Sequence, residues 1–419
     1  MSFKKEILHI AVQAQKASRY LSTLSGEQKN KALKAMAESL LKDKKAILEA
    51  NKKDIEFAMV QKMSGAFIDR LTLTDNIIKK MSEDLMSVIA LSDPVGKVIK
   101  MWRRPNGLNI CKMSVPIGVI GIIYESRPNV TSDCAALCLK AGNAVILRGG
   151  KESIHSNLAI YKAISNALTK CKFPQGCVSL IATTDREAVT IMLGLSDYID
   201  LIIPRGGESL IRSVVENSKI PVIKHYKGIC HTFVDKYADL SMAEEIAFNA
   251  KVQRPSTCNA MECLLVHKSI AAEFIPRIVK RLKKAKVEIR GCPKTIKLVT
   301  GVKRATNDDY ATEFLDKILS VKIVNSLNAA LAHIDKYGSK HSDAIVTDNF
   351  RRGIKFLKSV DSACVYLNAS TRFTDGNEFG LGAEIGVSTD KLHARGPMGL
   401  EELTTYKYMV MGNGQIRKQ

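Results

Sequence analysis

The sequence predicts an α/β protein in which helices cover mainly parallel sheets. Two observations support this class. Short apolar runs alternate with helical stretches from Val115 onward, and the first hundred residues have a helical pattern. The composition is that of a globular protein, with 46% hydrophobic and 25% charged residues. A chain of 419 residues exceeds the roughly 100–200 residues of one domain, so we expect two or three domains.

The N-terminal part is predicted to form amphipathic helices. Ser25-Gly-Glu-Gln28 matches a capping box, and Leu33, Met36 and Leu40 then recur at helical spacing. The chain begins with such a helix and not with an apolar signal region. The longest apolar run, Val115–Tyr124, falls short of the roughly 20 residues that cross a bilayer. We therefore expect a cytoplasmic protein that does not bind membranes.

Two sets of alternating strands and helices follow. The first set has expected strands at Val115–Tyr124, Ala144–Leu147, Val178–Ile181, Leu201–Ile203 and Pro221–Ile223, with helices such as Ser132–Ala141 and Ile154–Cys171. The second set begins near Phe233, with strands near Leu264–Val266, Ile323, Ala344–Val346 and Cys364–Leu367 and helices at Met242–Ala250, Ile270–Ala285 and Leu327–Lys336. Gly96–Met113 and Leu403–Met411 are predicted to be extended strands that no helix covers.

Charge and cysteine content exclude several functions. The chain has 63 Lys and Arg against 42 Asp and Glu, a net charge of +21. These cations are scattered, without a basic tail or an RNP-like aromatic pattern, so we expect attraction of anionic small molecules and no nucleic-acid binding. The ten cysteines form no CxxC pair and no zinc-type Cys/His spacing. Free thiols in a reducing compartment, and no metal, are therefore expected.

One cysteine lies in a setting that suits chemistry. Cys258 follows a helix that should end near Lys251, in the polar run Pro255-Ser-Thr-Cys258-Asn259. We predict that it sits just ahead of a new short helix, whose dipole would lower the pKa of the thiol. The alternative for any single cysteine is a small buried core residue. That is our interpretation of Cys263, which begins an apolar strand.

Two strand–turn–helix segments are candidate nucleotide sites. Ala144–Lys151 places two cations beside two glycines, which suits a phosphate group, and the turn after Leu201–Ile203 would expose helix-start N–H groups. No GxGxxG motif is present, so plain structural turns remain the alternative. The candidate cofactor residues are Arg148, Gly149, Gly150, Lys151, Arg205, Gly206 and Gly207.

A further polar cluster is a candidate substrate site. It combines Asn368–Phe373 with His393–Gly396. We expect Arg372 to receive a carboxylate or phosphate, since the guanidinium fork matches both groups. A surface salt-bridge network is the alternative.

Six blocks of the sequence carry a resemblance when they are taken together and in order. They are VPIGVIGIIYESRPNVT, AVILRGGKES, LIIPRGG, QRPSTCNAMECLLVH, VDSACVYLNASTRFTDGNEFGLGAEIG and HARGPMGLEELTT. These blocks resemble the gamma-glutamyl phosphate reductase (glutamate-5-semialdehyde dehydrogenase) family of the aldehyde dehydrogenase superfamily. The resemblance implies an aldehyde-dehydrogenase-like fold with a Rossmann-type cofactor domain, an α/β catalytic domain and a small β oligomerisation arm. The expected limits are 1–96 and 115–228 for the NADP-binding domain, 229–370 for the catalytic domain, 97–114 and 398–419 for the arm, and 371–397 for loops returning to the cofactor domain.

The resemblance also implies roles for individual residues. Cys258 would be the nucleophile, Asn129 and the Cys258 backbone N–H would hold the oxyanion with Asn259 beside them, and Glu313 would contact the nicotinamide ribose. Hydrolytic members of the superfamily carry a glutamate base in a Glu-Leu-Gly-Gly setting. The matching stretch here is Lys224-His225-Tyr-Lys-Gly-Ile-Cys, so a thioester should survive for phosphate or hydride exchange. The expected substrate residues are Ser370, Thr371, Arg372, Arg127, Arg395 and His225, although a structural histidine is the alternative for the last.

The implied activity is the NADPH-dependent reduction of L-glutamyl 5-phosphate to L-glutamate 5-semialdehyde and phosphate, a step of proline biosynthesis. The residues themselves do not distinguish NADPH from NADH. A glutamate 5-kinase would supply the substrate, and we expect it to be a separate protein. Exposed strand edges indicate a homodimer or larger assembly. The alternatives are another acylating semialdehyde dehydrogenase, dependent on CoA or phosphate, and a non-catalytic basic binding protein with the same fold.

Overall fold

The computed structural model describes residues 3–417 and divides the chain into two compact units. The first unit contains the residues up to Lys224, Gly380–Gly386 and the residues from Met398 onward. The second unit contains His225–Phe379 and Val387–Pro397. The loops 371–397 were predicted to return to the cofactor domain. Within them, Gly380–Gly386 is the stretch that belongs to the first unit. No helix within residues 3–417 is long and apolar enough to span a membrane.

Helices dominate the start of the first unit, as predicted. They are α1 (Phe3–Leu21), α2 (Gly26–Lys42), α3 (Lys44–Val60), α4 (Gly65–Leu71) and α5 (Asp75–Ala90). The predicted capping box forms at the start of α2, where the Ser25 hydroxyl accepts from the backbone N–H of Gln28 and the Gln28 side chain accepts from that of Ser25. Leu33, Met36 and Leu40 are buried on one face of α2, as their spacing predicts.

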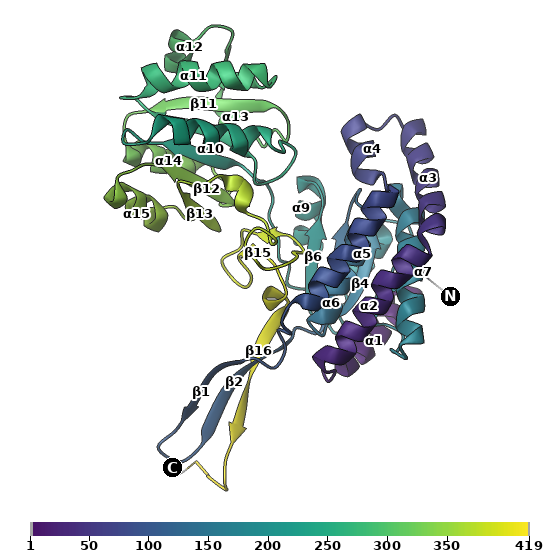
Figure 1. Cartoon of the computed structure of the whole chain (residues 1–419). Coiled ribbons are helices and arrows are strands. Elements are labelled where there is room, and N and C mark those ends of the chain that lie inside the picture. The colour runs from purple at the N-terminus through teal and green to yellow at the C-terminus, as the bar shows by residue number, and fades with distance from the viewer. Residues whose placement is uncertain (1–2, 418–419) are drawn as a thin grey trace. The chain divides into compact units, whose positions relative to one another are not determined.

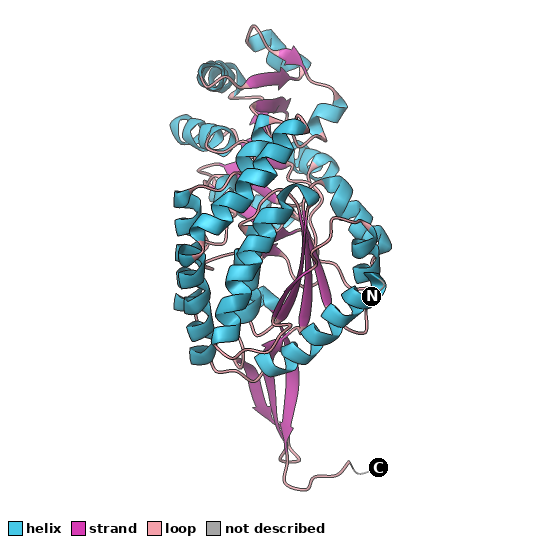
Figure 2. Ribbon diagram, turned by 90° about the vertical axis from the view of Figure 1, so that its right-hand side faces the viewer, coloured by secondary structure: helices cyan, strands magenta, loops and turns pink. Residues whose placement is uncertain are grey.

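A parallel sheet forms the centre of the first unit, in the order β5-β4-β3-β6. Its strands are β3 (Val119–Tyr124), β4 (Ala144–Gly149), β5 (Val178–Leu180) and β6 (Leu201–Arg205). The intervening helices are α6 (Val130–Lys140), α7 (Ile154–Lys170), α8 (Glu187–Leu193) and α9 (Glu208–Asn217). Helices flank this sheet on both sides (Figure 2). Burial on both faces explains why every residue of β3 and β4 is buried.

Two sequence predictions need correction in this unit. The run Val115–Tyr124 is not one strand, because Gly118 adopts a φ of +134° and separates the preceding strand from β3. A strand at Pro221–Ile223 was also wrong. This stretch forms an isolated bridge between Val222 and Ile202, because Pro221 has no N–H to extend a ladder.

The segments predicted to be uncovered strands form a separate antiparallel sheet, which we call the arm. It consists of β1 (Val98–Arg103), β2 (Asn109–Pro116) and β16 (Thr404–Met411), in the order β1-β2-β16. Figure 1 shows the two chain segments side by side. The arm exposes many large apolar side chains, among them Val98, Ile99, Met101, Tyr406, Tyr408 and Val410.

The second unit is built on a parallel sheet in the order β10-β9-β11-β8-β7-β12-β13. The strands are β7 (Cys230–Val234), β8 (Met261–His267), β9 (Glu288–Gly291), β10 (Lys303–Arg304), β11 (Ile318–Val324), β12 (Ser342–Val346) and β13 (Cys364–Leu367). The helices are α10 (Leu240–Val252), α11 (Ala271–Lys284), α12 (Pro293–Leu298), α13 (Asn307–Tyr310), α14 (Leu327–Tyr337) and α15 (Phe350–Ser359). A short pair, β14 (Val387–Ser388) and β15 (Gly396–Pro397), lies in the returning segment. The predicted α/β class is confirmed.

Strand β8 separates two apolar cores in the second unit. Leu264 and Val266 pack with α10 and α11 on one face, whereas Cys263 and Leu265 pack with α14 on the other. This alternation follows from the two-residue period of a strand. The side chains that surround Cys263 are therefore set by the strand register.

Candidate active site

Cys258 lies in a turn between α10 and β8. It is half-buried, and the chain enters β8 at Met261 without an intervening helix. The predicted short helix after Cys258 was therefore wrong. A backbone hydrogen bond from Ala260 N to Thr257 O closes the turn, and the apolar sequence after it pairs as a buried strand. The helix-dipole argument for the thiolate consequently does not apply.

The backbone of Cys258 rests on the segment that precedes β7. Gly228 is buried there, and a β-carbon at this position would lie 2.6 Å from the Cys258 Cα. The Cys230 thiol also donates to the Cys258 carbonyl oxygen at 3.2 Å. Sequence reasoning missed both supporting residues. The only available signal was the glycine itself, in the stretch Lys224–Cys230.

Asn259 joins this turn to the loop after β13. Its side-chain N–H donates to the Thr374 carbonyl at 2.9 Å, and its side-chain oxygen accepts from the Arg372 guanidinium. The buried Thr371 hydroxyl donates to the Asn259 carbonyl at 2.7 Å, and Ser370 accepts from the Arg372 N–H. Asn259 and Thr371 thus hold two loops together, whereas Ser370 bonds within the second loop, and the polar atoms of all three are engaged within the protein.

Arg372 lies at the edge of a cavity of about 330 Å³ beside this turn. The cavity is lined by Asn249, Gln253, Arg372, Phe373, Asp375, Asn377 and Glu378. The Arg372 Nε donates to Gln253 at 2.9 Å. Burial, and then the neighbouring Arg254, lower the pKa of Arg372, although a guanidinium stays charged in proteins. The structure therefore brings a fixed cation next to the Cys258 turn.

A buried ion pair supports the end of α10. Lys251 Nζ lies 2.6 Å from Glu262 in β8, and both side chains are almost fully buried. Burial raises the pKa of Glu262 to about 7 and lowers that of Lys251. Glu313, the residue predicted to contact the ribose, lies between α13 and β11 and is close enough to add to the shift in Glu262.

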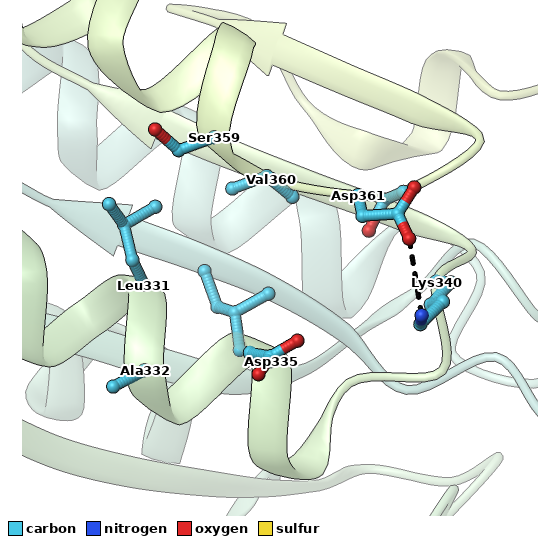
Figure 3. Close-up of a pocket in the computed structure, with 9 residues that line it drawn as sticks. Leu331, Ala332, Asp335, Lys340, Ser359, Val360 and Asp361 are labelled. Atoms are coloured by element: carbon cyan, nitrogen blue, oxygen red, sulfur yellow. Dashed lines mark hydrogen bonds and ion pairs between the residues drawn. The ribbon is translucent and has the colours of Figure 1, made fainter.

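Arg395 pairs with Asp361, whereas His225 is linked to the Cys258 turn through His341 and Cys230, since the Cys230 thiol lies 3.8 Å from His341 Nδ1 and donates to the Cys258 carbonyl. The Arg395 guanidinium pairs with Asp361 at 2.9 Å, in a surface network with Lys340 and Lys391. These cations hold the pKa of Asp361 far below its usual range. A neighbouring pocket, lined by Leu331, Val360 and other residues, contains none of the predicted site residues among those described (Figure 3). The His225 ring packs edge-on against His341, with ring centres 5.8 Å apart.

The two glycine-rich segments of the first unit meet at one edge of its sheet. Tyr124 at the end of β3 pairs with Gly149 on one side and with Arg205 on the other. Beyond these strand ends lie exposed Lys151 and the start of α9. Ligands of open α/β sheets bind at such an edge, outside the carboxyl ends of the strands.

Several residues of this edge have structural partners. A β-carbon at Gly149, Gly150 or Gly206 would overlap a neighbouring side chain, that of Asn157, Glu152 or Glu125 respectively. The Gly207 N–H donates to Glu125 at 2.9 Å. Arg148 is buried and donates to the carbonyls of Thr184 and Asp185 at 3.2 Å, and its burial lowers the pKa. Arg148 therefore holds the loop that would border a bound nucleotide.

Asn129 precedes α6, after the loop that follows β3. Its side-chain N–H donates to Asp133 at 2.9 Å. Burial, followed by the charge of Asp84, raises the pKa of Asp133 to about 7. Arg127 is half-buried in the same loop. The Asn129–Asp133 bond fixes the amide that the sequence predicts as an oxyanion donor.

Two parallel α/β sheets, one of which has glycine-rich turns at the carboxyl ends of its strands, place the chain in the class of two-unit α/β proteins whose first sheet has a nucleotide-type edge. The aldehyde dehydrogenase family profile matches residues 2–297. The chain is 55% identical over 418 residues to the gamma-glutamyl phosphate reductase of Thermodesulfovibrio yellowstonii, and 57% identical over 418 residues to that of Clostridium acetobutylicum. Each match covers 100% of both chains.

A solved structure agrees with these matches. The crystal structure of gamma-glutamyl phosphate reductase from Thermotoga maritima superimposes with a TM-score of 0.96 at 49% identity, covering 99% of this chain and 100% of that one. The chain belongs to the aldehyde dehydrogenase family, and it is an oxidoreductase. The predicted family and fold are thus confirmed, and the family fold implies a nicotinamide cofactor.

Proposed function

We propose that this enzyme reduces L-glutamyl 5-phosphate to L-glutamate 5-semialdehyde and phosphate, with NADPH as the reductant, through a thioester on Cys258. One observation carries the proposal: all ten cysteines are free and described, and Cys258 and Cys171 are the two that are not buried. Of these, Cys258 lies in the turn that Gly228, Cys230 and Asn259 support. The names of relatives at 55–57% identity supply the substrate, and the free thiols support a reducing, cytoplasmic setting for this step of proline biosynthesis.

The cavity beside the Cys258 turn is lined by the cation of Arg372 and by the carboxylates of Asp375 and Glu378, so it suits an amino acid derivative that carries both charges. Arg372 supplies a cation whose orientation is set by Gln253 and Asn259. A guanidinium held in this way matches a carboxylate or a phosphate group. The net charge of +21 would also raise the local concentration of such a substrate.

The sheet edge of the first unit suits a dinucleotide. The glycines at positions 149, 150 and 206 let the side chains of Asn157, Glu152 and Glu125 lie against the backbone at this edge, and Lys151 is exposed there. Arg186 is also exposed and lies near Arg148, among the carboxylates of Glu152 and Asp185. Lys151 and Arg186 are the cations that we propose for the additional phosphate of NADPH.

The chemical steps follow from the residues on the chain. The Cys258 sulfur attacks the acyl carbon, the carbon–oxygen bond to phosphate breaks, and phosphate leaves with the electron pair. The Cys258 N–H and the Asn129 amide are the proposed oxyanion donors, each typically worth about 3 kcal/mol of barrier. A bound nicotinamide supplies the hydride that reduces the thioester. The carbon–sulfur bond then breaks, which releases the aldehyde and restores the thiolate.

The segment Lys224–Cys230 contains no carboxylate, so it lacks the glutamate base with which hydrolytic members of the superfamily activate water against the thioester. Reduction and phosphorolysis should therefore outcompete hydrolysis. A separate glutamate 5-kinase activity would supply the acyl phosphate.

The experiment runs the reaction in reverse. Glutamate 5-semialdehyde is oxidised with NADP or NAD, in the presence of inorganic phosphate or of CoA, and reduced cofactor is followed by absorbance. We expect phosphate-dependent formation of NADPH that Cys258→Ser abolishes and Cys171→Ser leaves unchanged. Dependence on CoA would instead support a different acylating dehydrogenase. Near-normal turnover by Cys258→Ser would exclude the thioester.

The arm is the proposed contact with a second copy of the chain. Its outer strands β1 and β16 have unpaired edges in the single chain, and apolar side chains such as Val98 and Tyr408 are more than half exposed. We expect a dimer or larger assembly in equilibrium sedimentation, weakened by Val98→Lys. Val60→Lys on α3 is the control, since Val60 is equally apolar and 76% exposed outside the arm. A monomeric parent protein would refute this contact.

A further inference from the structure

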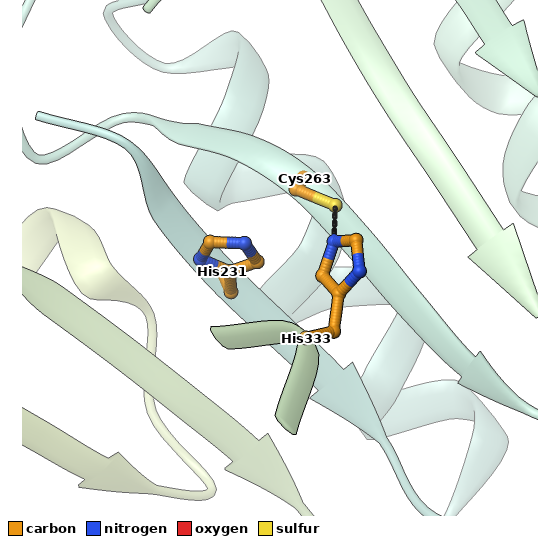
Figure 4. Close-up of side chains that lie close together, drawn as sticks. All are labelled: His231, Cys263 and His333. Carbon is orange, nitrogen blue, oxygen red and sulfur yellow. Dashed lines mark hydrogen bonds between the residues drawn. The ribbon is translucent and has the colours of Figure 1, made fainter. Parts of the chain in front are cut away.

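The second unit contains a buried cluster of one cysteine and two histidines, which lies in the apolar core under β7 and β8. His231 comes from β7, Cys263 from β8 and His333 from α14 (Figure 4). One nitrogen or sulfur atom from each residue lies within 4.8 Å of the other two. Their relative exposures are 0%, 1% and 5%, so water does not compete for these atoms.

His231 is oriented as a metal-binding histidine would be. Its Nδ1 is hydrogen-bonded to the buried carboxylate of Asp343 at 3.0 Å, and Asp343 is itself fixed by the Ser362 hydroxyl. The opposite nitrogen, Nε2, is buried and has no hydrogen-bond partner among the described residues. A buried polar atom without a partner is costly. A carboxylate behind the distal nitrogen is the usual second-shell partner of a histidine ligand.

The other two side chains have a spacing that suits zinc. Cys263 Sγ and His333 Nε2 are 3.6 Å apart. Zinc bonds of about 2.3 Å to sulfur and 2.0–2.1 Å to nitrogen, at a tetrahedral angle, place these two atoms roughly 3.6 Å apart. Two histidines and a cysteine also form a ligand set of the borderline-soft type that zinc prefers.

We propose that His231 Nε2, Cys263 Sγ and His333 Nε2 bind one Zn²⁺ per chain, as an ion that links β7, β8 and α14 in the second unit. Binding displaces two protons to solvent, one from the Cys263 thiol and one from Nε2 of His231, because, against the effect of burial, the Asp343 carboxylate raises the pKa of His231 to about 10. The three ligands are far apart in the sequence, so a search for short Cys/His spacings could not find them. The site uses Cys263 and leaves Cys258 free.

Lys322 sets the main condition for zinc binding. Its Nζ lies 3.0 Å from His333 Nδ1. For Nε2 to bind a metal, the ring proton of His333 must be on Nδ1, which faces the lysine. Lys322 would therefore move onto the rings of Tyr310 and Tyr337, whose centres its Nζ already approaches at 5.0 and 5.8 Å. Tyr310 and Lys322, which both contact His333, also line an open surface pocket. We propose that an ion enters from this pocket when Lys322 moves.

The test uses the full-length protein, stripped with a chelator and titrated with zinc chloride against a chromophoric competitor. We expect one zinc per chain, and a rise in melting temperature on loading because zinc binds the folded state. Cys263→Ser should weaken binding by at least about 100-fold, and Asp343→Asn by roughly 10- to 100-fold. Cys258→Ser and Cys171→Ser are the matched thiol controls and should bind zinc like the parent protein.

Lys322→Gln is the second variant, because it changes a half-buried residue at the pocket and leaves the ligands intact. The glutamine oxygen can accept a hydrogen bond from Nδ1–H of His333. The substitution also removes the positive charge of Lys322, so zinc should bind about tenfold more tightly. The site would be overturned if the parent protein takes up no zinc. It would also be overturned if Cys263→Ser still binds zinc or if Cys258→Ser does not. Unchanged affinity in Lys322→Gln would overturn coordination through His333 Nε2. None of these readouts depends on the proposed reaction.

Discussion

Gly228 supports the backbone of Cys258 so closely that a β-carbon at position 228 would lie 2.6 Å from the Cys258 Cα. Contacts of this kind do not occur between real β-carbons and backbone, so any other residue must displace the turn. The position of the Cys258 sulfur therefore depends on a glycine in the segment before β7. The Cys230 thiol, which donates to the Cys258 carbonyl, reinforces the same contact.

Gly228→Ala should impair catalysis more than stability. Displacement of the turn by about 1 Å should lower kcat roughly 100-fold, since reacting groups tolerate little misplacement. The rate at which iodoacetamide alkylates Cys258 should change in parallel. Gly65→Ala is the control, because a β-carbon at Gly65 meets nothing within 4 Å. Parental kcat in Gly228→Ala would show that the turn does not position the sulfur.

Arg372→Ala should raise the KM for the acyl phosphate about 100-fold, or about 2.7 kcal/mol, since charge-assisted hydrogen bonds contribute about 1.5–3 kcal/mol. Arg372→Lys should recover part of this loss, because it keeps the charge but not the bonds to both Gln253 and Asn259. Steady-state kinetics measure the effect, and circular dichroism checks the fold. Arg351→Ala, at an exposed site on α15, should behave like the parent enzyme. An unchanged KM in Arg372→Ala would remove Arg372 from the substrate site.

Lys151→Met should reduce the preference for NADPH. We expect the KM for NADPH to rise roughly tenfold while the KM for NADH changes little, because the lost cation would face the additional phosphate. The comparison of the two cofactors in one variant makes the test specific. Lys170→Met, at an exposed site at the end of α7, is the charge-matched control. Equal increases in the KM for NADPH and the KM for NADH would show that Lys151 contacts a part of the dinucleotide that both cofactors share.

Asp133 should make the stability of the first unit depend on pH. Burial raises its pKa to about 7 in the folded protein, against about 3.9 in an unfolded chain. A folded state with the higher pKa binds the extra proton, so this group favours folding most at low pH and loses that contribution as pH rises toward 7. Between pH 5 and pH 8 the parent protein should therefore lose more stability than Asp133→Asn.

Urea unfolding at pH 5 and pH 8 measures this difference. Asp197→Asn is the control, since Asp197 is exposed in the same unit. The asparagine at 133 can still accept from Asn129, so the fold should be retained. The assignment of the pH dependence to Asp133 would be refuted if the free energy of unfolding changes between pH 5 and pH 8 by the same amount in the parent protein and in Asp133→Asn.

Local pattern predicted most of the regular elements, because buried parallel strands and amphipathic helices leave a clear periodicity. Helix α14 and strand β4 were predicted to within a few residues. The short helix after Cys258 and the strand at Pro221–Ile223 were wrong, since turn closure and the lack of a pairing partner decide those segments. Helix α15 and strand β9 were not predicted at all.

The sequence alone determined the fold class, the family and the cysteine that the family places in a polar turn, because these depend on residue type and on order along the chain. Only the tertiary structure decided which atoms meet. It placed Gly228 under Cys258, tied Asn259 to Arg372, and brought His231, Cys263 and His333 together from two strands and a helix. Such contacts join residues far apart in the sequence, and strand register and helix packing set them, which local spacing does not encode.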